Sequence, residues 1–185
     1  MESTLRRTWA EIDLDALAHN YHALRRQMGP NARFLGVVKA DAYGHGAIQV
    51  GRELEALGAE YLAVSNMDEA RELRLGGINL PILQLGLTPA DQTPLILANR
   101  VTQAVYSEGA ARAFSDEAVR AGGRMKAHIK LDTGMSRLGF QCDEPHFDES
   151  LAAICRVARL PGLDIEGVFT PVSYTHLTLP TICSV

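Results

Sequence analysis

Residues 34–46 read FLGVVKADAYGHG, an apolar run that ends on a lysine and then passes through two glycines. Phe34–Val38 is short, apolar and β-branched at its end, which is typical of a strand buried on both faces of a sheet. Lys39 therefore stands at the carboxyl end of a predicted parallel strand, the edge where α/β proteins carry their active sites. The glycines allow the backbone to approach a ligand closely before a helix that we predict near Ile48–Leu57.

A lysine at this edge suits chemistry on a carbonyl cofactor. Partial burial disfavours the charged ammonium, and the free amine is the form that attacks an aldehyde. This chemistry fits pyridoxal phosphate, and Tyr43 could place its phenol near that cofactor. The ordinary alternatives are Lys39 as a solvated charge, Tyr43 as a packing residue at the rim, and the glycines as plain turn formers.

Strands and helices alternate along the chain, which predicts a parallel sheet. After Lys39 we predict helices near 48–57, 67–75, 90–98, 108–121 and 147–159, and strands at 61–64, 81–85, 101–105, 125–131 and 163–168. No glycine-rich dinucleotide fingerprint accompanies them, and this favours a barrel over a doubly wound sheet. Periodicity by itself does not decide between the two.

Composition is that of an ordinary enzyme. The chain has 185 residues, 46% of them hydrophobic, and a net charge of −4, so it can bury a core and carries no basic footprint for nucleic acid. Its three cysteines lack metal-ligand spacing and are interpreted as free thiols of a reducing compartment. No apolar stretch reaches the roughly 20 residues of a membrane helix. We expect a cytoplasmic protein with no metal site and neither nucleic acid nor membrane as a partner.

A second cluster of basic residues lies on and after the strand predicted at Met125–Leu131. His128 and Lys130 share one face of this strand, because alternate residues point the same way, and their burial would require a partner charge. Arg137 follows a turn at the carboxyl end of the strand, where its planar guanidinium could meet a carboxylate or a cofactor oxygen. The alternatives are an exposed Lys130 paired with Asp132, and Arg137 as a surface arginine.

Three segments resemble the alanine racemase family of pyridoxal-phosphate enzymes. Trp9–Leu17 with His19-Asn20 resembles the family's opening strand and first helix. Val37–Gly46 resembles its cofactor-lysine signature, and Lys130–Phe140 resembles its second signature. The three matches stand in the family's order. The resemblance covers most of residues 8–170. It implies an α/β fold, an incomplete (β/α)8 TIM-type barrel, with the family's C-terminal β domain absent from this chain.

The resemblance also implies an activity, the interconversion of L-alanine and D-alanine, which supplies D-alanine for peptidoglycan. Catalytic Lys39 would hold pyridoxal 5'-phosphate as an aldimine, Tyr43 and Arg137 would contact the cofactor, and Arg137 would also meet the substrate carboxylate. Lys130 matches a lysine that can be carbamylated and that then holds the matching arginine. The family works as a homodimer, in which the partner subunit supplies the second base.

The length and the ending of the chain predict a fragment. A complete barrel takes about 250 residues, and residues 1–170 supply only part of one, so we expect this chain by itself to be inactive and prone to aggregate. Residues 171–185 resemble a translated sequencing adapter and are interpreted as a non-native tail, with Pro171 standing where the family has a histidine. The alternatives are a genuine variant loop here and, for the whole protein, a non-catalytic barrel that binds pyridoxal phosphate.

Overall fold

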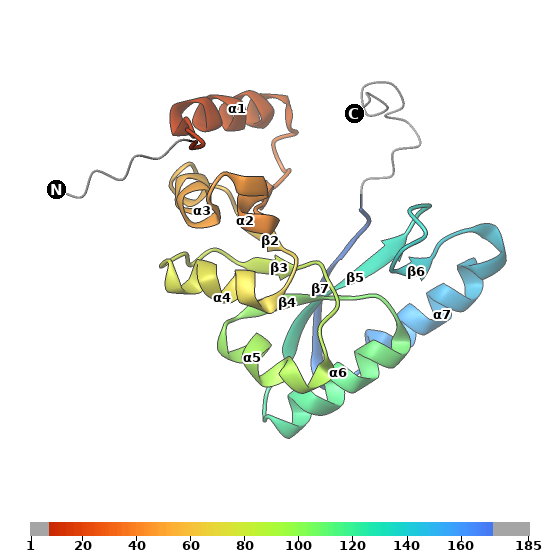
Figure 1. Cartoon of the computed structure of the whole chain (residues 1–185). Coiled ribbons are helices and arrows are strands. Elements are labelled where there is room, and N and C mark those ends of the chain that lie inside the picture. The colour runs from red at the N-terminus through yellow and green to blue at the C-terminus, as the bar shows by residue number, and fades with distance from the viewer. Residues whose placement is uncertain (1–7, 172–185) are drawn as a thin grey trace. The chain divides into compact units, whose positions relative to one another are not determined.

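The computed structural model describes residues 8–171, in which helices and strands alternate as the sequence predicts (Figure 1). The chain divides into two compact units, Met1–Ile82 and Leu83–Val185. Strands pair in parallel in both units, which confirms the α/β class. No helix in residues 8–171 has the length and apolar character needed to cross a membrane.

The first unit is built around a pair of parallel strands. Its elements are α1 (Leu14–Gln27), β1 (Leu35–Val37), α2 (Lys39–Gly44), α3 (Ala47–Ala56), β2 (Tyr61–Val64) and α4 (Met67–Leu75), and β3 (Ile82–Gln84) spans the boundary between the units. The register of β1 and β2 pairs Leu35 with Tyr61 and Val37 with Ala63. Residues 62–64 of β2 are fully buried, so this strand forms the core of the unit.

The second unit is built around β5, which pairs in parallel with β4, β6 and β7 (Figure 1). Its elements are η1 (Ala90–Gln92), α5 (Thr93–Ala98), β4 (Val101–Val105), α6 (Glu108–Arg120), β5 (Met125–Asp132), β6 (Phe140–Gln141), η2 (Glu144–His146), α7 (Phe147–Val157) and β7 (Leu163–Phe169). Ala127 is paired with Gln103 of β4 and Ile165 of β7. The carboxyl ends of these parallel strands meet at one edge.

Side-chain caps fix where several helices begin. Asn66 accepts a hydrogen bond from the backbone N–H of Glu69 at the start of α4, and Ser107 accepts one from Ala110 at the start of α6. Such caps satisfy N–H groups that have no partner inside the helix. α4 and α6 therefore start directly after the short loops that follow β2 and β4.

An ion-pair cluster joins α6 to α7 at the surface of the second unit. Glu108 bonds Arg156 and Arg112, and these guanidinium groups lower the pKa of Glu108 to about 2. Because the cluster is exposed, it orients the two helices and adds little to stability.

The structure differs from the sequence-based expectations in four places. β1, expected to be buried on both faces, is buried on one face only in the described part of the chain, where Leu35 and Val37 are 38% and 40% exposed. Trp9–Asp13, expected to form a strand, has no regular structure and is exposed, and Asp13 serves instead as the cap of α1. The helix expected near residues 90–98 is divided into η1 and α5. The short elements α2 and β6 were not expected, because neither has a periodic pattern. Residues 172–185 lie outside the described part of the chain, so the interpretation of the tail stays a prediction.

Candidate active site

Lys39 follows β1 after one residue, Val38, and opens α2, so it stands at the carboxyl end of a parallel strand as the sequence predicts. Val38 before it is buried, and its N–H donates to the carbonyl of Ala63 at 2.9 Å, which carries the pairing with β2 up to the lysine. Lys39 itself is half-buried. The backbone of this lysine is therefore anchored by the sheet, while its side chain stays accessible.

The turn after Lys39 is left-handed. The four residues Ala40–Tyr43 have φ between 50° and 55°, a conformation that costs L-residues roughly 1–2 kcal/mol each. Asp41 holds the end of the turn, because its carbonyl accepts the N–H of Gly46 at 3.0 Å and its carboxylate accepts the N–H of Ala47 at 2.7 Å. Strain of this kind survives only where surrounding contacts impose it, and it concentrates at functional sites.

Glycine at position 40 should tolerate this turn better than alanine does. Ala40 is exposed, so Ala40→Gly loses little packing, and relief of the left-handed strain opposes the extra entropy of the unfolded chain. We expect the free energy of unfolding to stay constant or rise by about 1 kcal/mol in urea denaturation. Ala110→Gly in the right-handed helix α6 is the control and should lower it by about 1 kcal/mol. Equal losses in both variants would contradict the left-handed turn.

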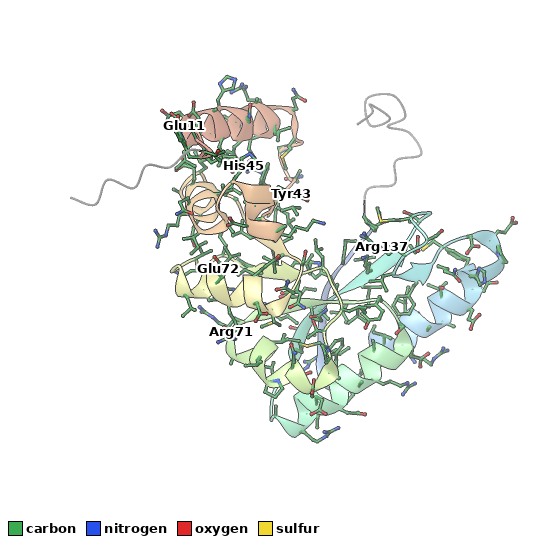
Figure 2. The ribbon with its side chains drawn as sticks, in the orientation of Figure 1. Glu11, Tyr43, His45, Arg71, Glu72 and Arg137 are labelled. Atoms are coloured by element: carbon green, nitrogen blue, oxygen red, sulfur yellow. The ribbon has the colours of Figure 1, made fainter. Side chains whose placement is uncertain are left out.

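Tyr43 lies at the end of the left-handed turn and faces Lys39. The Lys39 Nζ is 5.8 Å from the centre of the Tyr43 ring, within the range of a cation–π contact. Tyr43 is 62% exposed within the described part of the chain (Figure 2). The amine and the phenol thus border the same accessible space.

Gly44 and Gly46 take backbone conformations that require glycine. Their φ values are 85° and 87°, in the region that side chains disfavour. The interpretation of the two glycines as turn formers is confirmed. An added Cβ at position 44 would meet nothing within 4 Å, so the backbone is open at this point.

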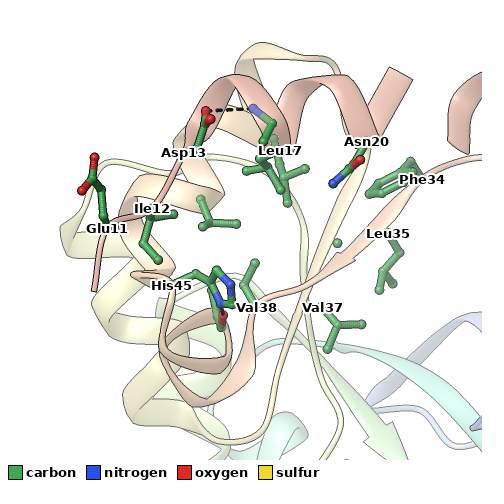
Figure 3. Close-up of a pocket in the computed structure, with 15 residues that line it drawn as sticks. Glu11, Ile12, Asp13, Leu17, Asn20, Phe34, Leu35, Val37, Val38 and His45 are labelled. Carbon is green, nitrogen blue, oxygen red and sulfur yellow. Dashed lines mark hydrogen bonds between the residues drawn. The ribbon is translucent and has the colours of Figure 1, made fainter. Parts of the chain in front are cut away.

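A cavity of about 510 Å³ lies in the first unit between residues 11–20 and β1 (Figure 3). It is lined mainly by apolar side chains, and His45 borders it with Nδ1 at 2.9 Å from the carbonyl oxygen of Ala42. Neither Lys39 nor Tyr43 lines the cavity. It is therefore separate from the accessible space at the lysine.

Lys130 and His128 share one face of β5, as predicted. Lys130 is only 3% exposed, so the alternative of an exposed lysine is wrong, and its Nζ lies 6.0 Å from the ring centre of Phe169. Burial lowers the pKa of His128, against the opposing effect of Glu166. The imidazole lies on the backbone of Gly167, where a Cβ would come within 3.1 Å of the ring.

Asp132, at the end of β5, organises the loop that carries Arg137. Its Oδ1 accepts the N–H groups of Ser136 and Gly134 at 2.9 and 3.0 Å, and its Oδ2 accepts the N–H of Arg137 at 3.0 Å. These bonds, that of Ser136 first, hold the pKa of Asp132 below its usual value. Arg137 is exposed (Figure 2), and the Asp132 carboxylate fixes the backbone segment that carries its side chain.

The same loop closes tightly where it returns to β5. A Cβ on Gly139 would lie 2.6 Å from the backbone nitrogen of Asp132, so only glycine fits there. β6 then pairs with the end of β5, Leu131 opposite Phe140. A cavity of about 480 Å³ opens beside the loop, and Arg137 is among its lining residues.

Sequence reasoning missed two carboxylates that hold these loops. Asp132 was considered only as a partner for Lys130, although an Asp before Thr-Gly is a signal for a side-chain-capped turn. No sequence motif singles out Glu69 as a contact of the lysine turn. Its carboxylate accepts the N–H of Ala40 at 2.9 Å, across 29 positions of sequence, and no local pattern announces that contact.

The structure thus brings Lys39 and Tyr43 together in the first unit. Lys130 and Arg137 lie in the second unit, at the end of β5 and on the loop that follows. The family model described as "Alanine racemase, N-terminal domain" matches residues 12–176. The match includes all four residues.

Curated relatives and solved structures agree with the family model. The alanine racemase of Desulfovibrio desulfuricans is 43% identical over 171 residues, which cover 92% of this chain and 44% of that protein. The alanine racemase of Clostridium difficile 630 in complex with cycloserine superposes with a TM-score of 0.85 at 40% identity, covering 92% of this chain and 46% of that one.

A racemase named for a different amino acid is also similar to this chain. The histidine racemase from Leuconostoc mesenteroides has a TM-score of 0.80 at 26% identity and covers 92% of this chain and 45% of that one. The chain thus spans less than half the length of each of these relatives.

Proposed function

The chain belongs to the alanine racemase family, whose N-terminal domain it matches, and from this we propose that the complete protein interconverts L-alanine and D-alanine in the cytoplasm with pyridoxal 5'-phosphate as cofactor. The observation that carries the proposal is Lys39 at the carboxyl end of β1, beside the Tyr43 phenol and followed by a strained turn. We propose further that the product D-alanine serves peptidoglycan synthesis and that the complete protein is a homodimer.

The side chains present fit the cofactor. Lys39 offers a half-buried primary amine to an aldehyde, Tyr43 offers a phenol, and the exposed Arg137 offers a planar cation to an anionic oxygen. The chemistry that this group supplies when bound is withdrawal of electrons from the α-carbon of alanine, which makes the α-proton acidic.

Lys39 has two tasks in this proposal. Its amine anchors the cofactor, and, once free, the same amine is a base that takes or returns the α-proton on one face of alanine. One amine reaches only one face of the carbon. Inversion therefore requires a second acid–base group, which we assign to the remaining part of the protein in a partner subunit.

Arg137 and Lys130 act together in this proposal. The guanidinium of Arg137 receives the carboxylate of alanine through paired hydrogen bonds. Carbamylation would replace the buried cation of Lys130 by an anion that can accept a hydrogen bond from Arg137. Isotope-labelled bicarbonate should then give a carbamate signal in NMR spectra, and persistence of that signal in Lys130→Ala would contradict the assignment.

We infer that the 185-residue chain by itself does not racemise alanine. Residues 1–170 provide one of the two bases, and we interpret residues 171–185 as a non-native tail. Cofactor binding at Lys39 is the function that this part can retain. It is also the second candidate function for the whole protein, as a barrel that binds pyridoxal phosphate without catalysis.

Resequencing of the source locus across the codon for Thr170 tests the proposal, followed by expression of both forms. The complete protein should convert L-alanine to D-alanine, measured by chiral chromatography, and should exchange the α-proton with solvent. The 185-residue chain should do neither. A complete protein that binds the cofactor and leaves alanine unchanged would favour the non-catalytic barrel, and racemisation by the short chain would show that its own residues suffice.

A further inference from the structure

We propose that Glu69 is the positioning residue of Lys39, a role that rests on the proposed function of Lys39. Glu69 lies in the first turn of α4 and is half-buried. Its carboxylate accepts backbone N–H groups that follow both strands of the pair, β1 and β2. Oε1 accepts the N–H of Ala40 at 2.9 Å and Oε2 accepts the N–H of Ser65 at 2.7 Å.

These two bonds join the carboxyl ends of β1 and β2. Ala40 follows Lys39 after β1, and Ser65 is the first residue after β2. The N–H of Ala40 belongs to the peptide plane that contains the carbonyl of Lys39, and a planar peptide turns as one body. A bond to this N–H therefore fixes the direction in which the Lys39 side chain leaves the backbone.

Capping of α4 does not account for these contacts. In a capping box, the glutamate at the third helical position bonds the backbone N–H of the cap residue itself. Here Asn66 is the cap and accepts the N–H of Glu69 at 3.0 Å, but the carboxylate of Glu69 bonds Ser65 and Ala40 instead. One oxygen is thus committed to the turn that carries the lysine.

The left-handed turn explains why such a contact is needed. The bonds made by Asp41 and by the N–H of Ala42 lie within the segment 38–47 and move with it. The bond from Glu69 comes from another helix, so it ties the turn to the body of the unit. A strained turn held in this way keeps Lys39 in place while its side chain exchanges partners.

Glu69→Gln is the sharpest variant because it keeps the shape and changes one atom. A carboxamide has one acceptor oxygen and one NH₂ donor, so only one of the two backbone N–H groups keeps its bond. Glu72→Gln is the matched control: Glu72 is exposed on the next turn of the same helix and loses the same charge (Figure 2). Asn66→Ala is the second control, because it removes the cap and leaves the Glu69 carboxylate.

The test uses the 185-residue chain with pyridoxal 5'-phosphate as the probe. Adducts are reduced with borohydride, and mass spectrometry gives the ratio of labelled Lys39 to labelled Lys126, an exposed reference amine. Hydrogen exchange at the amide of Ala40 is followed by NMR in the same variants. Circular dichroism establishes that the proteins compared contain the same folded fraction.

We expect Glu69→Gln to lower the labelling ratio about tenfold and to speed exchange at Ala40, while Glu72→Gln behaves like the parent chain. Asn66→Ala should speed exchange in the first turn of α4 and leave the ratio close to that of the parent. An unchanged ratio in Glu69→Gln, or an equal loss in Asn66→Ala, would overturn the positioning role. If the parent chain itself does not label Lys39, the cofactor binding proposed for this part of the protein fails, whereas unchanged exchange at Ala40 in Glu69→Gln would refute the positioning role of Glu69 separately.

Discussion

Lys39→Ala abolishes racemisation by the complete protein and removes the borohydride-stable pyridoxal adduct from the 185-residue chain: this is the largest functional effect that we expect. The variant loses the anchoring amine and the base together. Because a positioned general base alone contributes about 10²- to 10⁴-fold, we expect activity to fall by at least about 10³-fold. The measurements are initial rates of D-alanine formation and the mass of the reduced peptide that contains position 39.

Two further variants test whether the loss of activity is specific to the amine of Lys39. Lys39→Arg keeps a positive charge but has no nucleophilic amine, so it should fail as completely as alanine does. Lys126→Ala removes an exposed lysine paired with Glu166 and should leave both the rate and the adduct at position 39 unchanged. An adduct of undiminished yield in Lys39→Ala would move the cofactor to another amine and remove the basis of the mechanism.

The largest effect on stability should come from Gly162→Ala. A Cβ at this position would lie 2.1 Å from the backbone oxygen of Ser115 and 2.8 Å from its Cα, in the buried middle of α6. Backbone atoms of a helix cannot move aside as a side chain can. The loop before β7 would have to leave α6, and we expect a loss of more than about 3 kcal/mol in the free energy of unfolding.

The damage should extend to β5. The N–H of Gly162 donates to the Ser115 Oγ at 3.0 Å, and the carbonyl of Gly162 accepts the N–H of Met125 at 2.8 Å. Displacement of Gly162 therefore breaks both bonds and loosens the first residue of the central strand. Gly109→Ala in α6 is the control: its Cβ would meet nothing within 4 Å, so the variant should gain about 0.5–1 kcal/mol. Similar urea midpoints for the two variants would contradict the packing described here.

Much of the fold could be predicted from local pattern. The expected strands at 61–64 and 101–105 and the expected helix at 67–75 coincide with β2, β4 and α4. α4 has a helical apolar period and begins at the cap Asn66, and the two strands are short runs dominated by apolar and β-branched residues. The position of Lys39 at a strand end was predicted in the same way, and the family that its motif resembles was confirmed by the matching of residues 12–176.

Local pattern failed where the backbone departs from what its residues prefer. Ala-Asp-Ala-Tyr gives no signal for a left-handed turn, because L-residues avoid that conformation unless distant contacts impose it. The burial of Lys130 also had no sequence signal, since an alternating strand is equally compatible with a buried and an exposed lysine. The catalytic, cofactor and substrate roles proposed for Lys39, Tyr43, Arg137 and Lys130 stay predictions.

The sequence by itself determined most of the longer helices and strands, their order, and the motif that places a lysine after β1, because these depend on residues close together in the chain. Only the tertiary structure decided that Glu69 holds Ala40 across 29 positions and that Gly162 packs on Ser115 across 47. In both cases packing selects the partner: a carboxylate or a hydroxyl can satisfy any nearby N–H, and the fold determines which one comes within reach.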